Sequence, residues 1–202
     1  MSLSTSQAAA ELGVTPRQVR RAAVSGRIVA AKAGAAHAFS PRQVQALERT
    51  AHRGRDWSPA TQLAALDLLA WGKTRELTST ERSRLKRRIR DSEVGALAGQ
   101  ILRGRVTLRR AASDETKSRF VSALSSELGL SARGGLGVLV AKDAAREARR
   151  ARLGLDDSGD IAVIEGDEAH RKVLEAMALF VYGDARESAA AARWISAAQD
   201  AV

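Results

Sequence analysis

The stretch "TPRQVRRA", residues 15–22, has the pattern of a helix that begins at its first residue and shows positive charge on one side. Thr15 is a favoured N-cap residue, Pro16 suits the first helical position, and Gln18 has the spacing of a capping box. At about 100° per residue, one face is apolar and contains Val19, Ala22 and Ala23. The opposite face carries the polar side chains Arg17, Gln18, Arg20 and Arg21.

The same pattern of signals predicts a helix before this stretch and two short strands after it. The segment "STSQAAAELGV" begins with Ser4 and Gln7 at capping-box spacing and reaches a stop signal at Gly13. Downstream, "RIVAA" (27–31) and "HAFS" (37–40) read as strands separated by the turn "KAGAA". The order predicts two helices joined by a short turn and followed by a β-ribbon.

The opening phrase returns almost unchanged as "SPRQV", residues 40–44. We interpret both copies as helix starts, with a capping residue, Pro at the first position and Gln at the third, and not as an internal duplication. The helix that begins at Ser40 is expected to reach about Thr50. It continues with "QAL" where the first has an arginine pair, and Val44 and Leu47 have the spacing of core contacts. This pattern indicates a supporting helix.

A helix that shows Arg and Gln from its first turns, after another helix and a short turn, has the form that reads DNA in the major groove. Arg can donate two hydrogen bonds to guanine, and Gln can pair with adenine. Arginines not used for bases can hold phosphates. We therefore predict DNA contacts by Thr15, Arg17, Gln18, Arg20 and Arg21. The alternative is an exposed amphipathic helix whose arginines are simply solvated.

The first quarter of the chain resembles the MerR/excisionase group of winged helix-turn-helix domains. The likeness is carried by Ala8-Ala9-x-x-Leu12-Gly13-Val14-Thr15, Arg17-x-Val19-Arg20-Arg21, Gly26-x-Ile28 and the ribbon ending "HAFSPRQV". The resemblance implies that the second helix enters the major groove, and that Lys32 with Gly34 forms a wing tip along the DNA backbone. The wing "KAGAAHA" departs from the pattern, because it has a single Lys where such wings often carry Arg.

A second basic block follows in "TERSRLKRRIRDS", residues 80–92. Residues 1–55 hold nine Lys or Arg against two acidic residues, and residues 73–112 hold twelve against four. An excess confined to one half of a chain favours a polyanionic partner. Only Leu85 and Ile89 form an apolar seam here, and no acidic residue nearby is expected to balance the charge. We predict a second DNA-backbone contact by Arg84, Arg87 and Arg88; the alternative is a helix that lies over the core with solvated arginines.

Overall, the patterns predict a mainly α protein with some β, an α+β fold. Three regions are expected: a winged helix-turn-helix at 1–55, a basic helical segment at 56–112 and a small α/β region at 113–202. In the last region "DETKSRFVSALSSEL" is expected to form one helix, while "GLGVLVA" and "DIAVIEG" read as strands. The apolar helix "VLEAMALFVY" has two readings, a surface for a partner or dimerisation, or the core of its own domain.

Several classes of function are not expected. The chain has no Cys, its three His are scattered, and no Ser/His/Asp set has local support, so we expect no metal, no cofactor and no catalysis. No apolar run approaches the roughly 18 residues that span a membrane. The N-terminus lacks the pattern of a signal peptide. A cytoplasmic, nucleoid-associated protein with double-stranded DNA as its partner is the expectation.

A second, looser likeness spans most of the chain. The order of parts resembles that of actinobacterial helix-turn-helix antitoxins encoded beside nucleotidyltransferase-like toxins, including an ending of the type Gly-Asp-x-Arg-Glu, here Gly183 to Glu187. It implies a repressor of its own operon whose C-terminal half binds a toxin. The alternative is an excisionase-like architectural factor that bends DNA for a recombinase. The further 150 or so residues argue against that alternative.

Overall fold

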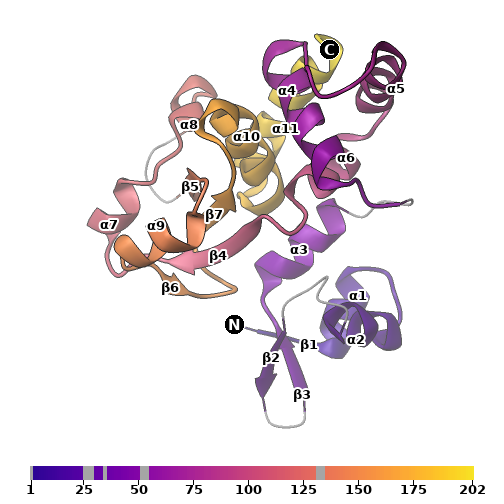
Figure 1. Cartoon of the computed structure of the whole chain (residues 1–202). Helices are drawn as coiled ribbons and strands as arrows, with labels where there is room; N and C mark the ends of the chain where they lie inside the picture. Colours follow the sequence, from indigo (N-terminus) through magenta and orange to yellow (C-terminus); the bar gives the residue numbers. More distant parts are fainter. Residues whose placement is uncertain (1, 25–29, 34–35, 51–54, 131–134) are drawn as a thin grey trace.

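The computed structural model describes residues 2–24, 30–33, 36–50, 55–130 and 135–202. It confirms the mixed α+β class, with helices predominating and strands confined to two small sheets. We call the described residues up to 50 the head and residues 55–202 the body. The head lies at the lower end of Figure 1, and the body above it joins a four-stranded sheet to a layer of helices.

The head contains helices and strands in the order expected from its sequence. Residues 27–29 of the strand predicted at 27–31 lie outside the described residues, and the two strands extend into the turn predicted at 32–36. Helices α1 (Thr5–Glu11) and α2 (Pro16–Val24) are joined by a short turn, and α3 (Pro41–Arg49) closes the unit. Between them, strands β2 (Ala30–Ala33) and β3 (Ala36–Phe39) pair antiparallel. Strand β1 (Leu3–Ser4), which the sequence did not predict, adds to the far edge of β3, giving the order β1-β3-β2.

Capping chemistry explains where these helices begin and end. Ser4 and Gln7 form the predicted capping box, and Gly13 follows α1 with φ +62°, a conformation that glycine adopts without strain. The two copies of the repeated phrase differ. The first makes its cap, since the Gln18 backbone N–H donates to Thr15 Oγ1 at 3.3 Å. The second makes no side-chain cap, and Ser40 Oγ is buried without a hydrogen-bond partner, so the predicted cap is wrong there.

A small apolar cluster holds the head together. Val19, from the apolar face of α2, packs with side chains of α1, β3 and α3, and all five members of the cluster are buried: Ala8, Ala9, Val19, Phe39 and Val44. The periodicity of α2 therefore points its apolar face inward, as predicted, and leaves its basic face outward.

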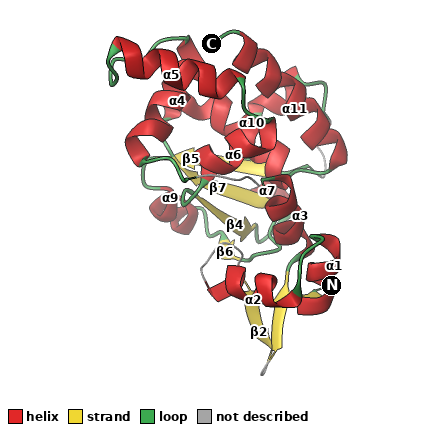
Figure 2. Ribbon diagram, turned by 90° about the vertical axis from the view of Figure 1, so that its right-hand side faces the viewer, coloured by secondary structure: helices red, strands yellow, loops and turns green. Residues whose placement is uncertain are grey.

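Five helices make the helical layer of the body, seen from the side in Figure 2. They are α4 (Pro59–Trp71), α5 (Ser79–Arg90), α6 (Val94–Leu102), α10 (Arg171–Tyr182) and α11 (Ala185–Asp200), with a 3₁₀ turn η1 (Glu168–His170) before α10. Thr78 and Glu81 form the predicted capping box of α5. None of the described helices is both long and apolar enough to cross a membrane.

The body sheet has the strands β4 (Val106–Arg110), β5 (Gly137–Ala141), β6 (Gly154–Leu155) and β7 (Ile161–Glu165) in the order β5-β7-β4-β6, and only the β5–β7 pair is parallel. Two of these strands, β5 and β7, are buried on both faces, whereas β4 is partly exposed and β6 is exposed. Helix α9 (Ala144–Arg150) makes the crossover between β5 and β7. In β7, Ile161 and Val163 pack toward α9, while Ala162 and Ile164 join the main core with α10. Two-sided burial explains the continuous apolar run.

In the last region, the structure corrects one predicted helix and favours one of the two readings of α10. The single helix predicted over residues 114–128 is wrong, because α7 (Asp114–Ser118) and α8 (Ala123–Glu127) are separated by a turn at residues 119–120 and a β-bridge from Val121 to Gly137. There the carbonyl of Phe120 accepts from the Val138 N–H at 2.7 Å, so pairing with β5 overrides the local helical preference. Of the two readings of α10, the structure favours core: Val173 to Leu179 are all buried by the chain itself.

Helix α3 belongs to both parts of the molecule. Val44 lies in the head cluster and Ala46 in the main cluster of the body. Arg49 Nη1 donates to three carbonyl oxygens at the end of α10, those of Phe180, Val181 and Gly183, at 3.1, 3.0 and 2.8 Å. Burial lowers the pKa of this guanidinium below its usual value. The main cluster also crosses the predicted boundary at residue 112, since it contains both α4 and α10.

Candidate nucleic-acid interface

The outer face of α2 is the first part of the candidate site. Val19 is only 1% exposed, whereas Arg17, Arg20 and Arg21 are all exposed. Among the residues that the structure describes, none of these three arginines has an ion-pair or side-chain hydrogen-bond partner. Three arginines within the first two turns therefore present free N–H donors on one side of the helix.

Gln18 has a structural task that sequence reasoning did not weigh against its predicted contact with adenine. Its Oε1 accepts from the Thr15 N–H at 2.8 Å and from Thr15 Oγ1 at 3.0 Å. Reading adenine with two hydrogen bonds requires the amide oxygen as acceptor and the amide nitrogen as donor. With the oxygen already accepting two hydrogen bonds, only Nε2 is available. The cap thus occupies both Thr15 and Gln18 while it is formed.

The predicted wing is described only in part. Lys32 lies on β2 in register with His37 on β3, and its side chain lies outside the described part of the structure. Gly34, the predicted wing tip, is also outside the described residues. The role assigned to Lys32 by resemblance stays a prediction.

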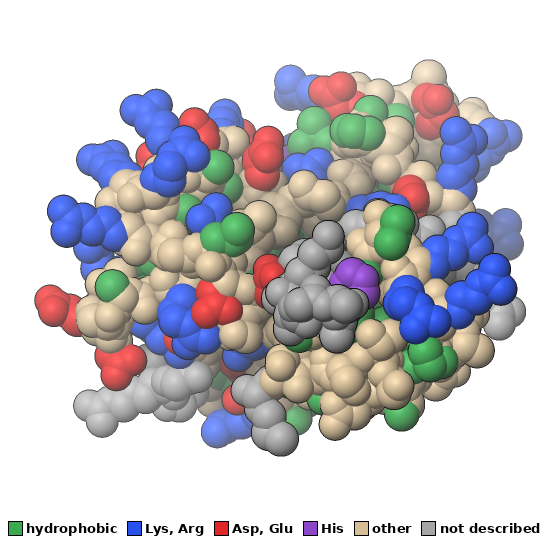
Figure 3. All heavy atoms as spheres, turned by 90° about the horizontal axis from the view of Figure 1, so that it is seen from below, with side chains coloured by type: hydrophobic (Ala, Val, Ile, Leu, Met, Phe, Trp, Pro, Cys, Tyr) green, Lys and Arg blue, Asp and Glu red, His purple; other side chains and the backbone are tan. Residues whose placement is uncertain are grey.

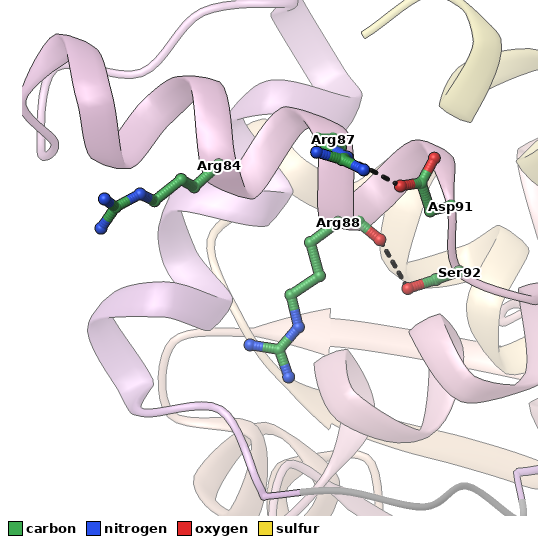
Figure 4. A pocket seen from close by; sticks show the side chains of 5 residues that line it. All are labelled: Arg84, Arg87, Arg88, Asp91 and Ser92. Atoms are coloured by element: carbon green, nitrogen blue, oxygen red, sulfur yellow. Dashed lines mark hydrogen bonds and ion pairs between the residues drawn. The ribbon is translucent and has the colours of Figure 1, made fainter.

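Helix α5 carries the second group of predicted site residues. Arg84, Arg87 and Arg88 are exposed and, with Asp91 and Ser92, line a shallow, open depression (Figure 4). The guanidinium carbon of Arg88 lies 4.9 Å from the ring centroid of Trp57, a cation–π contact. Arg87 Nε makes an exposed ion pair with Asp91 at 3.3 Å.

Within residues 80–92, Arg87 pairs with Asp91, so the expectation that no acidic residue balances the basic block does not hold for that arginine. Two arginines that follow the block, Arg103 and Arg110, pair with acidic residues distant in sequence. Arg103 pairs with Asp56 at 2.5 Å, and Arg110 pairs with Asp156 at 2.6 Å. Among the residues that the structure describes, Arg84 has no ion-pair partner, so α5 keeps more unpaired charge than the segment that follows it.

The two basic helices lie at opposite ends of one side of the molecule. In Figure 1, α1, α2, α5 and α6 follow the right-hand side, with α5 at its upper end and α2 at its lower end. Figure 2 looks onto that side and again places α5 at the top and α2 near the bottom. Figure 3 looks onto the lower end, where a group of Lys and Arg side chains stands at the right-hand edge, the side of α1 and α2.

No protein-family model, curated protein or solved structure matches this chain. The assignment of function therefore depends on the geometry of the residues themselves.

One buried polar network in the body has the residue types of a catalytic site but not its geometry. His170 Nε2 and Asp67 Oδ1 are 2.9 Å apart, and Thr74 Oγ1 donates to the other Asp67 oxygen at 2.9 Å. A nucleophilic hydroxyl would need to bond the imidazole, with the carboxylate behind it. Here the carboxylate stands between the two, so the network joins α4 to η1. Among the described residues, no three His, Asp or Glu side chains converge as metal ligands.

Proposed function

We propose that the protein is a sequence-specific DNA-binding transcriptional regulator, with α2 as the recognition helix of a winged helix-turn-helix head. One observation carries the proposal: α2 buries Val19 against the head core and presents Arg17, Arg20 and Arg21 outward without partners among the described residues. A structural surface helix would be expected to pair some of these charges. A helix intended for the major groove keeps them free for base edges and phosphates.

The geometry of α2 suggests different DNA contacts for its individual side chains. Arg17 and Arg21 are four residues apart, so they lie one above the other on the same side of the helix. Both are candidates for bidentate contacts with guanine, and Arg20 for a phosphate contact. Thr15 and Gln18 hold the start of the helix, and their contribution to binding is mainly to position the arginines.

The test measures binding of Arg17→Ala and Arg21→Ala to a duplex that the wild-type protein has selected from a random pool. A bidentate guanine contact should be worth about 1–3 kcal/mol and its loss should relax the preference at one base position. A phosphate contact should lower affinity for all sequences alike and make the salt dependence about one unit shallower. Melting temperatures should stay near that of the wild type, because both side chains are exposed.

Gln45→Ala, on the supporting helix α3, is the matched control. Gln45 is exposed but lies outside the proposed recognition helix, so its substitution should leave binding nearly unchanged. Equal losses for Gln45→Ala and Arg17→Ala, with similar melting temperatures, would show that the two helices have been assigned the wrong roles.

The finer predictions from resemblance remain proposals. An autorepressing antitoxin would add a toxin as partner of the body, and the burial of α10 means that the partner would have to use another surface. Helices α4, α6, α10 and α11 give the body a core of its own, which supports a regulator over a small excisionase-like architectural factor. A location with the nucleoid in the cytoplasm follows from the proposed function.

A further inference from the structure

The arginine face of α5 has the chemistry of a phosphate-binding surface. Helix α5 carries six Lys or Arg and one acidic residue, Glu81, whose carboxylate is used in the cap. Its apolar residues Leu85 and Ile89 are buried in the main core. Arg84, Arg87 and Arg88 lie on one stripe at spacings of three and four residues, about 5–6 Å along the axis. The stripe is thus a row of guanidinium groups on a rigid support.

Two contacts hold this row of arginines in position and leave N–H donors available for a phosphate. The guanidinium of Arg88 lies over the ring of Trp57, and among the described residues no group accepts a hydrogen bond from its side chain. The ion pair between Arg87 and Asp91 uses only the Nε of Arg87, and both side chains are largely exposed. Exposed pairs of this kind contribute little, so a phosphate can compete for the terminal nitrogens. Arg84 points into solvent in Figure 4.

The surface suits a phosphate backbone better than a protein. Stable protein interfaces are built around buried aromatic or aliphatic anchors. The large hydrophobic side chains that the described structure exposes are Val14, Val24, Leu63, Trp71 and Leu155, and none of them lies on α5. Arginine N–H forks without an apolar centre match phosphate oxygens.

We propose that Arg84, Arg87 and Arg88 contact the phosphate backbone of the same DNA duplex that α2 enters, to one side of the α2 site. The inference rests on the proposed function of α2. Both helices lie on the side of the molecule that faces the viewer in Figure 2, at its two ends. A chain of this length has a radius of gyration of roughly 16 Å, so its ends are separated by no more than about 50 Å. That separation corresponds to about one to one and a half turns of DNA at roughly 34–36 Å per turn.

The experiment compares two duplexes that share the selected α2 site at their centre. One has about 12 base pairs and ends about 20 Å from the centre, and the other extends about 12 base pairs further on each side. The variant Arg84→Gln/Arg87→Gln removes two charges from α5 and leaves the contact between Arg88 and Trp57 intact. The matched control, Arg149→Gln/Arg150→Gln, removes two exposed charges from α9, on the other side of the molecule.

On the long duplex, the α5 variant should bind about 5- to 30-fold more weakly at 150 mM salt, with a slope of log K against log[salt] shallower by roughly 1–2 units. On the short duplex its affinity and slope should equal those of the wild type. The α9 variant should match the wild type on both duplexes. Equal melting temperatures for the three proteins would show that each is folded.

Each other result overturns the proposal. An α5 variant that binds both duplexes like the wild type, while Arg17→Ala weakens both, removes the α5 contact and leaves the proposed function standing. An equal loss on both duplexes places the contact within the α2 site. If the variant instead loses only the capture of a second labelled duplex, α5 bridges two DNA molecules. Wild-type protein that selects no duplex from the pool contradicts the proposed function itself.

Discussion

At the scale of single residues, Gln18 shows that one side chain can suit two different roles. The position of Gln18 suits both a capping box at the start of α2 and a contact with adenine, and the neighbouring sequence does not distinguish these two roles. In the structure, Gln18 accepts hydrogen bonds from Thr15 and is therefore part of the helix cap. Val19 and Arg17 are simpler, because helical periodicity alone separates a buried face from an exposed one.

Asp156 provides a test of residue-scale electrostatics through pH. Arg110, which pairs with it at 2.6 Å, and Ser158, which donates to it twice, lower its pKa from 3.8 to about 2. A lowered carboxyl pKa adds stability that is present above pH 4 and is lost as pH falls from about 4 toward about 2; for this partly exposed pair it amounts to no more than about 1 kcal/mol. A carboxyl-carbon NMR titration should find the midpoint near 2.

The Arg110→Gln variant supplies the comparison in the same titration. Without the guanidinium, the midpoint of Asp156 should move toward 3.8, while the pKa of Asp157, raised by burial, should remain above its usual value. A wild-type midpoint near 3.8 would mean that the ion pair between Asp156 and Arg110 does not persist in solution.

At the scale of elements, α2 should separate stability from binding. Val19→Ala removes two methyl groups from a residue that is 1% exposed, and it should lower the free energy of unfolding by about 1–2 kcal/mol. Val24→Ala makes the same chemical change on the same helix at a position that is 85% exposed, and should change stability by less than about 0.5 kcal/mol. Chemical denaturation of both variants measures the difference. Equal losses would contradict the assigned face of α2.

Local signals predicted most elements because capping boxes and apolar periodicity act within a few residues. The boxes at Ser4 and Thr78 and the strand at Ile161 are examples. The failures share a different cause. Strand β1 exists only because β3 offers an edge, and the helix expected at 114–128 is interrupted because Phe120 pairs with β5. The acidic partners of Arg103 and Arg110 are likewise distant in sequence, so local reasoning could not find them.

At the scale of the whole molecule, the main core draws on both sides of residue 112. Strand β4 lies between β7 and β6, and α4 and α6 cover α10. Residues 113–202 alone would lack all three elements and expose apolar faces of α10 and the sheet.

We therefore expect a fragment of residues 113–202 to lack cooperative thermal unfolding, whereas a fragment of residues 56–202 should unfold in a single transition. Circular dichroism during heating distinguishes the two. A cooperative transition for the shorter fragment would show that the C-terminal region is an independent domain, as the sequence suggested.

The shared helix α3 limits how the head can be exchanged between proteins. A junction placed after residue 50 would carry Arg49 away from the three α10 carbonyls that it satisfies and leave Ala46 facing solvent. A junction placed before Pro41 would open the head by removing Val44. In addition, a side chain at Gly95 would collide with the Arg49 carbonyl, since a Cβ there would lie 2.0 Å from its oxygen. The head is therefore not a transplantable cassette, and a working chimera would have to inherit the surface of α6 and α10 on which α3 rests.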